Sequence, residues 1–524
     1  MRPRVNDPIA PVARLAVAIR ADASGSIGAG HVIRCLALAT VLREKGHEAE
    51  FVMGEADGDL RDLVAERHGF RVTTLTPASP GAHAPADELD DARKTLGALA
   101  GRHVDWVIVD HYGLGARWET TIQSSGRHVL AIDDHASRDH ACDIVVDHNL
   151  TPANVYATRV APNTELLLGP RYALLRPEFA RFKSPRPTAE HPEIILVSFG
   201  GVDPSGQTSR ALRALQEAQR APRRLIALAG RDNPDLERLR AMAADWPALE
   251  IHEFVDDAAA LMQEADLAIG AGGVSALERL AAGVPSIVQA TADNQEHPAE
   301  ALANEGALLY LGPAAKTDDA TLARAIATMA NRHLREAMRR RGLALVDGHG
   351  PQRILRAIRR RTPVTVRPAA DHDRLRIHAW RNHRVIRATA FDASEIPRTA
   401  HERWFEGVLA DPDRHLLVAE HRGTPIGVIR YDLNRKHGTA ELSIFLAPEV
   451  LGLGLGKPAL VAANAWLAEH ETDITRIDAQ VLGNNQRSHQ LFESVGFGVR
   501  RTVLGLERTT TPSKPSDNPP HGGT

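Results

Sequence analysis

Short, almost wholly apolar runs alternate with amphipathic helical patterns between Leu15 and about Leu311. Strands that are apolar on both faces and separated by helices are typical of parallel sheets covered by helices on both sides. The strands expected on this basis are LAVAIRAD, EAEFVM, VDWVIVD, HVLAIDD, DIVVDHN, EIILVSFGG, RRLIALAG, LEIHEFV, DLAIGAGG, PSIVQA and ALLYLG. The pattern therefore predicts an α/β fold of the doubly wound kind.

A charged, Pro-containing segment, FARFKSPRPTAEHPE, interrupts this rhythm near residues 180–192. We interpret it as a linker between two Rossmann-like domains, an N-terminal one over residues 14–182 and a C-terminal one over residues 190–350. Two such domains are expected to face each other across a cleft, with ligands at the carboxyl ends of the strands. Helical patterns between Asp318 and Arg361 are expected to close the second domain.

The pattern of apolar and polar residues changes again after the segment RRRTPVTVRPAADHD. HLLVAEHRGTPIGVIRYDL has two strand-like runs around an Arg-Gly-Thr-Pro turn, and TAELSIFLAPE is typical of a further strand. These elements predict a separate α+β domain over residues 363–508. Residues 1–13 are expected to form an N-terminal extension, and the residues 509–524, rich in Pro, Ser and Thr, a disordered tail.

Composition mainly excludes certain partners and kinds of site. Hydrophobic residues make up 43% and charged residues 25% of the chain, and the net charge of −3 gives no reason to expect nucleic acid as a partner. The only cysteines, Cys35 and Cys142, exclude a disulfide framework and a cysteine-built zinc site, and they fit a reducing cytoplasm. No segment approaches a membrane-spanning length, so a soluble, cytoplasmic protein without membrane insertion is expected. The sequence leaves the oligomeric state open.

The stretch SIGAGHVIRCLALATVLREKG places a glycine turn directly before an amphipathic helix. Gly28 and Gly30 let the backbone turn tightly off the preceding strand, and the helix is expected to end at Gly46. His31 then lies at a strand-to-helix turn that faces the cleft, where a neutral imidazole can take a proton. The alternative is a structural histidine bonded to a loop carbonyl. Because the glycines do not complete the dinucleotide fingerprint, a nicotinamide cofactor is not expected.

A second glycine turn, GAGGVSALERL, follows a strand and precedes a helix. The free N–H groups at Gly272, Gly273 and Ser275, together with the helix dipole, form an anion site suited to a diphosphate. Glu278, about one turn into the same helix, is positioned to accept two ribose hydroxyls, the alternative being an exposed helix residue.

Two further segments add candidates for the same cleft. Asn294 and Gln295 follow the next strand and are candidates for binding sugar hydroxyls or an acetamido group. Gly201, in FGGVDPSG, belongs to another glycine turn across the cleft.

Seven motifs occur in order along the first part of the chain: IRADASGSIGAGHVIRCLALA, VIVDHY, AIDDHASRDHACDIVVDHNL, LLLGPRYALLRPEF, SFGGVDP, GAGGVSALERLAAGVPSI and ADNQ. Together they resemble the UDP-sugar hydrolases of pseudaminic acid biosynthesis, over about residues 14–345. Those enzymes act on UDP-2,4-diacetamido-2,4,6-trideoxy-β-L-altropyranose. The resemblance implies a pair of domains arranged as in GT-B glycosyltransferases, with UDP bound mainly by the second.

The same resemblance implies roles for individual residues. It makes His31 the general base that activates water for attack at the anomeric carbon with inversion, and places Asp110 and Tyr112 beside it in the catalytic site. His148 is a departure, since the family commonly has glutamine there. The scheme requires no metal.

A third glycine turn, LGLGLGKPAL, places Gly452, Gly454 and Gly456 before a helix, where backbone N–H groups can hold a pyrophosphate. Together with NNQRSHQLFESVGFGVRRTV, one strand later, it resembles the GNAT N-acetyltransferases over residue 363 to about residue 505. AWRNHRVIRATAF and TAHERWFEGVL further resemble the branch that contains the pseudaminic-pathway amino-sugar acetyltransferase. The resemblance implies acetyl-CoA as cofactor, with Asn485 contacting it.

Two residues depart from the GNAT pattern. Leu451 stands where the family has Gln or Arg, and Phe492 stands where many members carry a tyrosine that protonates the departing CoA thiolate. Glu441 is a candidate for relaying the proton of the substrate amine, the alternative being an edge-strand surface charge. Residues that could shape a sugar pocket are Trp380, Arg381, His401 and Trp404, of which Trp404 fits a core position equally well.

The two resemblances predict consecutive reactions. The acetyltransferase would acetylate the 4-amine of a UDP-amino sugar, and the hydrolase would then release the diacetamido sugar from UDP. Tethering the two raises the local concentration of the intermediate. The alternatives are a GT-B glycosyltransferase that uses a UDP-sugar donor, and a non-catalytic nucleotide-sugar-binding protein whose acetyltransferase domain is degenerate.

Overall fold

The computed structural model describes residues 14–23, 29–56, 59–75, 87–181, 187–217, 222–253, 255, 257–361, 363–421 and 423–500. The expected N-terminal extension, the expected C-terminal tail and Gly28 lie outside these residues. The chain divides into two compact units, Met1–Arg361 and Thr362–Thr524, here called unit 1 and unit 2. No helix in the described ranges is both long and apolar enough to cross a membrane.

Unit 1 begins with a parallel sheet of order β3-β2-β1-β4-β5-β6-β7. Its strands are β1 (Ala16–Ala21), β2 (Glu48–Gly54), β3 (Arg71–Leu75), β4 (Trp106–Asp110), β5 (His128–Ile132), β6 (Ile144–Asp147) and β7 (Glu165–Leu168). Helix α1 (Gly30–Glu44) packs on one face, while α2 (Glu88–Ala98) and α3 (Ala116–Gln123) pack on the other. As expected, α1 ends before Gly46, whose φ of 79° is accessible to glycine at little cost.

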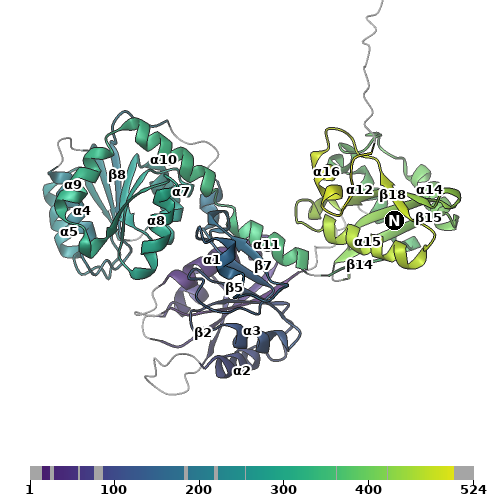
Figure 1. Cartoon of the computed structure of the whole chain (residues 1–524), viewed down its shortest axis with the longest axis horizontal. Helices are drawn as coiled ribbons and strands as arrows, with labels where there is room; N and C mark the ends of the chain where they lie inside the picture. The colour runs from purple at the N-terminus through teal and green to yellow at the C-terminus, as the bar shows by residue number, and fades with distance from the viewer. Residues whose placement is uncertain are drawn as a thin grey trace, which may run out of the picture. The chain divides into compact units, whose positions relative to one another are not determined.

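A second parallel sheet follows, with the order β10-β9-β8-β11-β12-β13. Its strands are β8 (Ile194–Ser198), β9 (Arg224–Leu228), β10 (Leu249–His252), β11 (Leu267–Ala271), β12 (Ser286–Ala290) and β13 (Leu309–Pro313). One face carries α6 (Ala258–Glu264), α7 (Val274–Ala281) and α8 (Glu296–Asn304). The other carries α4 (Gln207–Gln216), α5 (Leu236–Asp245) and α9 (Asp319–Thr328), and Figure 1 shows these two layers on either side of β8. Apolar strands covered on both faces explain why the runs in the sequence are continuous.

The last two helices of unit 1 go to different sheets. Helix α10 (Arg332–Leu345) packs against α7 of the second sheet. Helix α11 (Gly350–Arg361) instead packs against α1, and its buried Ile354, Leu355 and Ile358 join the core of the first sheet. The expectation that all helical patterns up to Arg361 close the second domain is therefore wrong for α11, because its apolar stripe is buried against α1.

Unit 2 contains a mostly antiparallel sheet of order β14-β15-β16-β17-β18, in which only β17 and β18 run parallel. Its strands are β14 (Val364–Pro368), β15 (Arg414–His421), β16 (Thr424–Asn434), β17 (Thr439–Leu446) and β18 (Arg476–Ala479). Its helices are α12 (Arg374–Asn382), α13 (Arg384–Arg387), α14 (Arg398–Ala410), α15 (Gly456–His470) and α16 (Gln486–Glu493).

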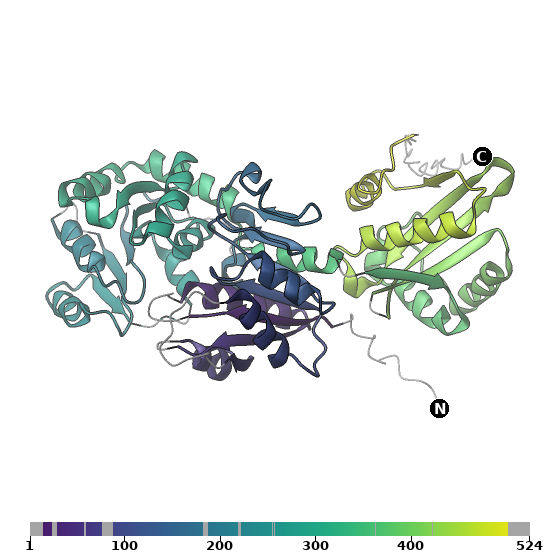
Figure 2. The same cartoon turned by 60° about the horizontal axis from the view of Figure 1, so that its bottom comes forward.

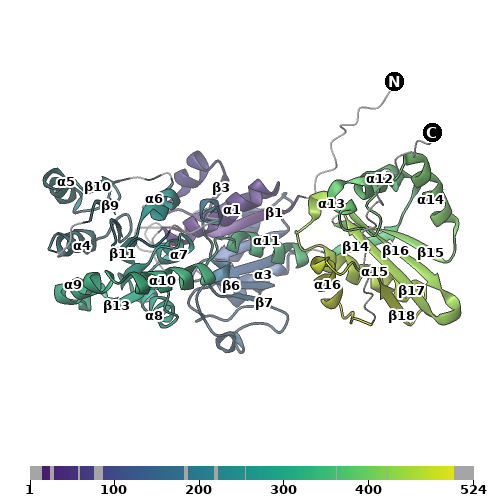
Figure 3. The ribbon, with the colours of Figure 1, turned by 90° about the horizontal axis from the view of Figure 1, so that it is seen from above.

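Alternate residues of β16 show which helices cover each face of this sheet. The Tyr431 hydroxyl bonds Asn464 on α15 at 2.7 Å, whereas Arg430 faces a cavity that is also lined by residues of α12 and α14. Neighbouring residues of a strand point to opposite faces, so α15 covers one face and α12 with α14 the other. Figure 2 shows the yellow-green α15 along the strands, and Figure 3 shows α12 and α14 on the opposite side.

A buried ionic cluster joins α3 to the segment between β5 and β6 of the first sheet. The His140 ring, 3% exposed, donates from Nδ1 to Glu119 Oε1 at 2.6 Å and from Nε2 to Asp133 Oδ2 at 3.2 Å. Burial lowers the pKa of His140, but the hydrogen bonds to Asp133 and Glu119 more than offset this and raise the pKa to about 9. His140 is therefore an imidazolium clamped between two carboxylates.

The clamp predicts a pH-dependent stability. Because the folded-state pKa of His140 lies above its unfolded value, its stabilisation is complete below pH ~6.5 and is lost as the pH rises toward 9, by about 3 kcal/mol at most. The melting temperature of the wild type should fall over this range. His140→Gln should melt lower at pH 6 and lack this part of the slope, while replacement of the exposed His333 by Gln should keep it. A wild-type slope in His140→Gln contradicts the assignment.

Candidate functional site

His31 and Asp110 form the centre of the candidate site in unit 1. His31 is the second residue of α1, and Asp110 is the last residue of β4, the neighbour of β1. The two side chains meet in a hydrogen bond of 2.5 Å between Nδ1 and Oδ1. His31 is only 5% exposed, so it is more deeply buried than its position in the glycine turn suggests. The partner of the ring is a carboxylate rather than a loop carbonyl.

Arg34, one turn after His31, completes this group. Its Nε and one terminal nitrogen donate to the two oxygens of Asp110 at 2.5 and 2.6 Å, and its other terminal nitrogen donates to Asp134 at 2.6 Å. Burial raises the pKa of Asp110, but the Arg34 cation and the hydrogen bonds from Arg34 and His31 lower it to about 2. Asp110 is therefore ionised at any physiological pH. The residue pattern gives no role to Arg34, although its spacing of three from His31 puts both on one helix face.

The ionised carboxylate fixes the tautomer of His31. A carboxylate only accepts hydrogen bonds, so Nδ1 carries the proton and Nε2 keeps a lone pair. A terminal nitrogen of Arg34 also lies 3.2 Å from Nδ1, but two donors cannot share a hydrogen bond, and the shorter contact to Asp110 determines the arrangement. This assignment rests on the hydrogen-bond network. Nε2 is the nitrogen that can accept a proton from a ligand or water.

Tyr112 connects the histidine to the second half of unit 1. Its ring makes edge contacts with His31 and His135, with centroids 4.5 and 4.8 Å away, and its hydroxyl lies close enough to the side chains of Asn294 and Asp134 for both to affect its pKa. Burial and the nearby Asp134 carboxylate raise the pKa of Tyr112 to about 12, so the hydroxyl stays protonated. The residues singled out from two distant segments are thus brought together across unit 1.

The glycine turn between β11 and α7 has the geometry of an anion site. Its N-cap, Gly273, offers no side chain to the first turn, so the first N–H groups of α7 have no side-chain cap in the described part of the chain. The turn is held from behind by Gln295, whose amide oxygen accepts from the Gly272 N–H at 3.2 Å and from the Thr291 N–H at 3.0 Å. The expectation of a free N–H group at Gly272 is therefore wrong, because Gln295 already accepts from it, and the Gln295 oxygen that was expected to bind a sugar holds the turn instead.

The neighbouring glycine turn, which contains Gly201, is already satisfied. Asp203 accepts from the N–H groups of Gln207 and Thr208, at 3.0 and 2.7 Å, and so fills the N-terminus of α4. Gly201 itself lies against Gly230, whose N–H donates to the Gly201 carbonyl at 2.8 Å. Of the two helix N-termini, α7 rather than α4 is therefore the one left open for an anion.

Glu278 lies on α7 with its side chain 14% exposed, 3.4 Å from a terminal nitrogen of Arg176. Burial raises the pKa of Glu278, and Arg176 opposes this shift. Arg176 also pairs with Glu178 at 3.3 Å, so it is shared between two carboxylates. The contact between Arg176 and Glu278 is long for an ion pair, which leaves Glu278 able to exchange Arg176 for hydroxyl donors.

One group of potential metal ligands, Glu119, His140 and Cys142, brings its ligand atoms within 4.8 Å of one another. Both ring nitrogens of His140 already donate to carboxylates, and the raised pKa of His140 keeps them protonated. A metal ligand must present an unprotonated nitrogen, so the geometry fits an ionic clamp better than a metal site.

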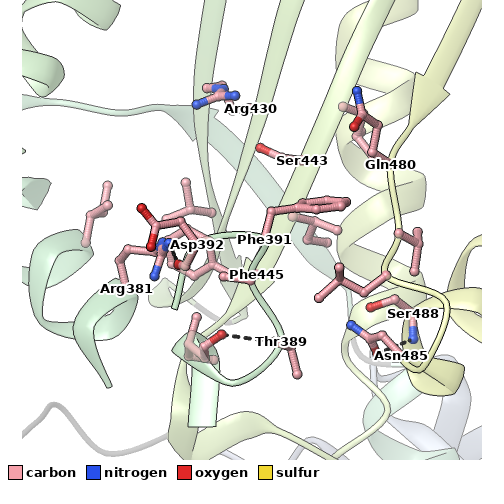
Figure 4. A pocket seen from close by; sticks show the side chains of 18 of the residues that line it. Arg381, Thr389, Phe391, Asp392, Arg430, Ser443, Phe445, Gln480, Asn485 and Ser488 are labelled. Carbon is pink, nitrogen blue, oxygen red and sulfur yellow. Dashed lines mark hydrogen bonds between the residues drawn. The ribbon is translucent and has the colours of Figure 1, made fainter. Parts of the chain in front are cut away.

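Unit 2 has a cavity of about 440 Å³, shown in Figure 4. The parallel pairing of β17 and β18 ends at Leu442 and Ala479, and the residues that follow on both segments line the cavity. The cavity therefore opens between β17 and β18, where the two strands separate. Of the residues expected here, those that line the cavity are Arg381, His401, Trp404, Asn485 and Phe492, whereas Trp380 is buried and does not line it.

The glycine turn of unit 2 also has an open helix N-terminus. Gly452 and Gly454 adopt φ angles of 78° and 79°, which L-residues rarely adopt, and Gly456 starts α15. The N-cap, Leu455, supplies no side-chain acceptor. Asn485 is itself a cap, because its side chain accepts from the Ser488 N–H at 3.2 Å at the start of α16.

Glu441 does not line the cavity. It is exposed on β17, and its Oε1 accepts a hydrogen bond of 3.2 Å from Gln480, which does line the cavity. The charged groups on the wall are Arg381, Asp392 and Arg430, which the residue pattern indicates only for Arg381. Arg381 and Arg430 each keep one buried nitrogen without a hydrogen-bond partner among the described residues.

A comparison with known proteins finds a family match in each of the two units. Residues 375–497 match the model of the acetyltransferase (GNAT) family, and residues 207–347 match the glycosyltransferase family 28 C-terminal domain. The crystal structure of MurG from Acinetobacter baumannii is 19% identical, with a TM-score of 0.49 over 65% of this chain and 98% of that chain.

Three relatives differ in how much of the chain they match. The spore coat polysaccharide biosynthesis protein SpsG of Bacillus subtilis is 26% identical over 64% of this chain and 96% of its own length. The UDP-2,4-diacetamido-2,4,6-trideoxy-β-L-altropyranose hydrolase of Campylobacter jejuni is 26% identical over 48% and 82%. An uncharacterized protein of Methanocaldococcus jannaschii is 24% identical over 94% and 98%, and so matches both units. The sheet orders and the family matches confirm the expected fold class, a GT-B-like pair of Rossmann-like lobes followed by an α+β GNAT acetyltransferase domain.

Proposed function

We propose that unit 1 hydrolyses a UDP-linked diacetamido sugar to UDP and the free sugar, and that unit 2 acetylates the amine of the preceding UDP-amino sugar with acetyl-CoA. The observation that carries the first activity is the hydrogen bond between Asp110 and Nδ1 of His31, since it leaves a basic Nε2. The Campylobacter jejuni hydrolase among the relatives supports the choice of substrate.

The proposed hydrolysis uses His31 as general base. Nε2 takes a proton from water while the water oxygen attacks C1 of the sugar, and the bond between C1 and the diphosphate oxygen breaks with its electrons passing to UDP. Asp110 stabilises the imidazolium that forms, as the carboxylate does in a Ser-His-Asp triad. The open N–H groups of α7 stabilise the charge gathering on the leaving diphosphate. His31 then returns its proton to solvent.

A glycosyltransferase would place an acceptor hydroxyl where the hydrolase places water. His31 is 5% exposed and lies against the Tyr112 ring, so the space beside it favours a small nucleophile over a bulky acceptor. This burial is the observation that favours hydrolysis over transfer.

The acetyltransferase proposal rests on the charges around the cavity of unit 2. A UDP-amino sugar carries an ammonium group and a diphosphate. Asp392 offers a carboxylate to the first, and the guanidinium groups of Arg381 and Arg430 bring positive charge to the cavity wall for the second. Acetyl-CoA is the acetyl donor, with its pyrophosphate at the Gly452–Gly456 turn.

The transfer step needs a proton acceptor and a proton donor. The substrate ammonium first loses a proton through water toward Glu441, which Gln480 holds by a hydrogen bond. The neutral amine nitrogen then attacks the acetyl carbonyl, its second proton is lost to water, and the bond between the carbonyl carbon and sulfur breaks as the CoA thiolate departs and takes up a proton. Phe492 cannot supply this proton. Ser488 lies one helical turn before Phe492 on the cavity wall, with its hydroxyl pointing toward the cavity in Figure 4, and it is the proposed donor.

Incubation of the full chain with the UDP-sugar and no acceptor tests the first activity. We expect UDP release in ¹⁸O-labelled water, with the label in the sugar and none in UDP, because the carbon–oxygen bond breaks. His31→Ala and Asp110→Asn should lower kcat by about 10²- to 10⁴-fold while UDP still binds. His103→Ala, an exposed histidine of the same lobe, is the control and should keep full turnover. An intact UDP-sugar without an acceptor contradicts hydrolysis, and unchanged turnover in His31→Ala contradicts the mechanism.

For the proposed acetyltransferase we expect one substitution to affect mainly substrate binding and another to affect mainly turnover. Asp392→Asn should raise KM for the UDP-amino sugar by about tenfold with little change in kcat, because it removes the counter-charge of the ammonium. Glu441→Gln should lower kcat by about 10²-fold with little change in KM. Steady-state acetylation assays measure both. If Glu441→Gln leaves kcat unchanged, Glu441 is the edge-strand surface charge that its exposure suggests.

A further inference from the structure

Arg279 is a fully buried cation directly behind the open glycine turn of unit 1. It lies on α7 with 0% of its surface exposed. One terminal nitrogen donates to the Ala271 carbonyl at 2.6 Å and the other to Ser275 Oγ at 3.3 Å. Its Nε has no hydrogen-bond partner within the described ranges. Both contacts are to the turn that runs from β11 into α7.

The fold makes room for this guanidinium at Gly270. A Cβ on Gly270 would lie 2.9 Å from a terminal nitrogen of Arg279 and 2.3 Å from the Ser198 carbonyl oxygen. Glycine at this position therefore lets the cation reach the carboxyl ends of β8 and β11. That is the edge of a doubly wound sheet where ligands bind.

Arg279 lacks the counter-charge that a buried cation normally has. No carboxylate forms an ion pair with it in the part of the chain that the structure describes, and the adjacent Glu278 contacts Arg176 instead. Burial lowers the pKa of Arg279 to about 10, and the nearby Glu278 opposes this shift without offsetting it. A buried charge without a partner is costly, so an anion on the outer side of the turn would be favoured by Arg279 as well as by the helix N-terminus.

Ser275 provides the route by which this charge reaches a ligand. Because Ser275 Oγ accepts from Arg279, its own proton is free to be donated outward, and a hydroxyl that accepts a charged hydrogen bond is a stronger donor. We propose that Arg279 is the built-in counter-charge of a nucleoside-diphosphate site, acting through Ser275 and the glycine turn without touching the ligand. This inference rests on the proposed function, because it takes the anion to be the diphosphate of UDP. Arg279 is thus a positioning residue.

Titration calorimetry of the full chain with UDP and with uridine tests this role. Arg279→Met should raise the dissociation constant for UDP by about tenfold or more and leave that for uridine unchanged, since uridine has no phosphate. Arg279→Gln, which is also neutral but keeps a donor for Ala271, should show the same loss. Arg279→Lys, which keeps the charge, should lose less. Combining Ser275→Ala with Arg279→Met should add little beyond the single changes, because both interrupt one chain of hydrogen bonds.

Arg335 provides the matched control. It is also fully buried in the same lobe and bonds backbone carbonyls, including Met329 at 2.8 Å, but it lies away from the turn. Arg335→Met should change the melting temperature without changing the preference for UDP over uridine. Should Arg279→Met fail to fold, Arg279→Gln decides.

The outcomes separate this inference from the proposed function. A neutral variant at position 279 that keeps the wild-type preference for UDP, or loses uridine equally, overturns the role of Arg279 alone. A wild-type chain that binds UDP no better than uridine overturns the nucleotide site and the role of Arg279 together.

Discussion

The carboxylate of Asp110 is the point on which the candidate site of unit 1 depends. It ends β4 beside β1, and both of its oxygens are occupied by residues of the first turn of α1. This one group fixes where α1 begins relative to the sheet and which nitrogen of His31 is protonated. Arg34 in turn keeps Asp110 ionised despite its burial. Tautomer, ring position and charge state therefore follow from a single buried cluster, and loss of the Asp110 carboxylate would remove one of the two carboxylates that pair with the buried Arg34, leaving Asp134.

Whether a side chain caps the first N–H groups of a helix distinguishes a candidate anion site from a structural glycine turn. Helix α4 follows a glycine turn, yet Asp203 fills its N-terminus. Helices α7 and α15 follow equally glycine-rich turns, and their N-caps, Gly273 and Leu455, supply no acceptor. Free N–H groups at a helix start are normally satisfied by a side chain, water or a ligand. The same kind of sequence motif therefore has opposite meanings, and the nearby carboxylate decides between them.

Much of the fold could be predicted from the sequence because its central strands are apolar on both faces. The apolar runs do not predict β3 and β7, since RVTTL and ELLL lie at the two edges of their sheet, where fewer side chains are buried. The sequence also does not predict which sheet α11 packs against, because an apolar stripe shows that a helix is buried but not against which core.

Part of the candidate site, like part of the fold, could be predicted from the sequence, and part could not. Spacing identified His31 and the α7 turn, and the GNAT resemblance identified the α15 turn, because glycine turns are local features. The partners that give them their chemistry come from distant segments or from buried helix faces. Arg34 and Arg279 both resemble ordinary core-facing helix positions in the sequence, and only their contacts reveal a function. Glu441 is exposed and lies outside the cavity, and only its hydrogen bond to the cavity-lining Gln480 connects it with the proposed reaction.

In both proposed reactions the substrate enters with its diphosphate, so each unit needs groups that attract the negative charge of the diphosphate, and the two units supply them differently. Unit 2 places the Arg381 and Arg430 side chains on the cavity wall, which suits a substrate that must enter and leave with its diphosphate intact. Unit 1 presents backbone N–H groups with Arg279 behind them, which suits stabilisation of charge that develops as the diphosphate departs, since fixed dipoles need no reorganisation. A tether between the units raises the local concentration of the shared intermediate without any fixed arrangement of the two. The Methanocaldococcus jannaschii protein is similar to this chain over 94% of its length, across both units.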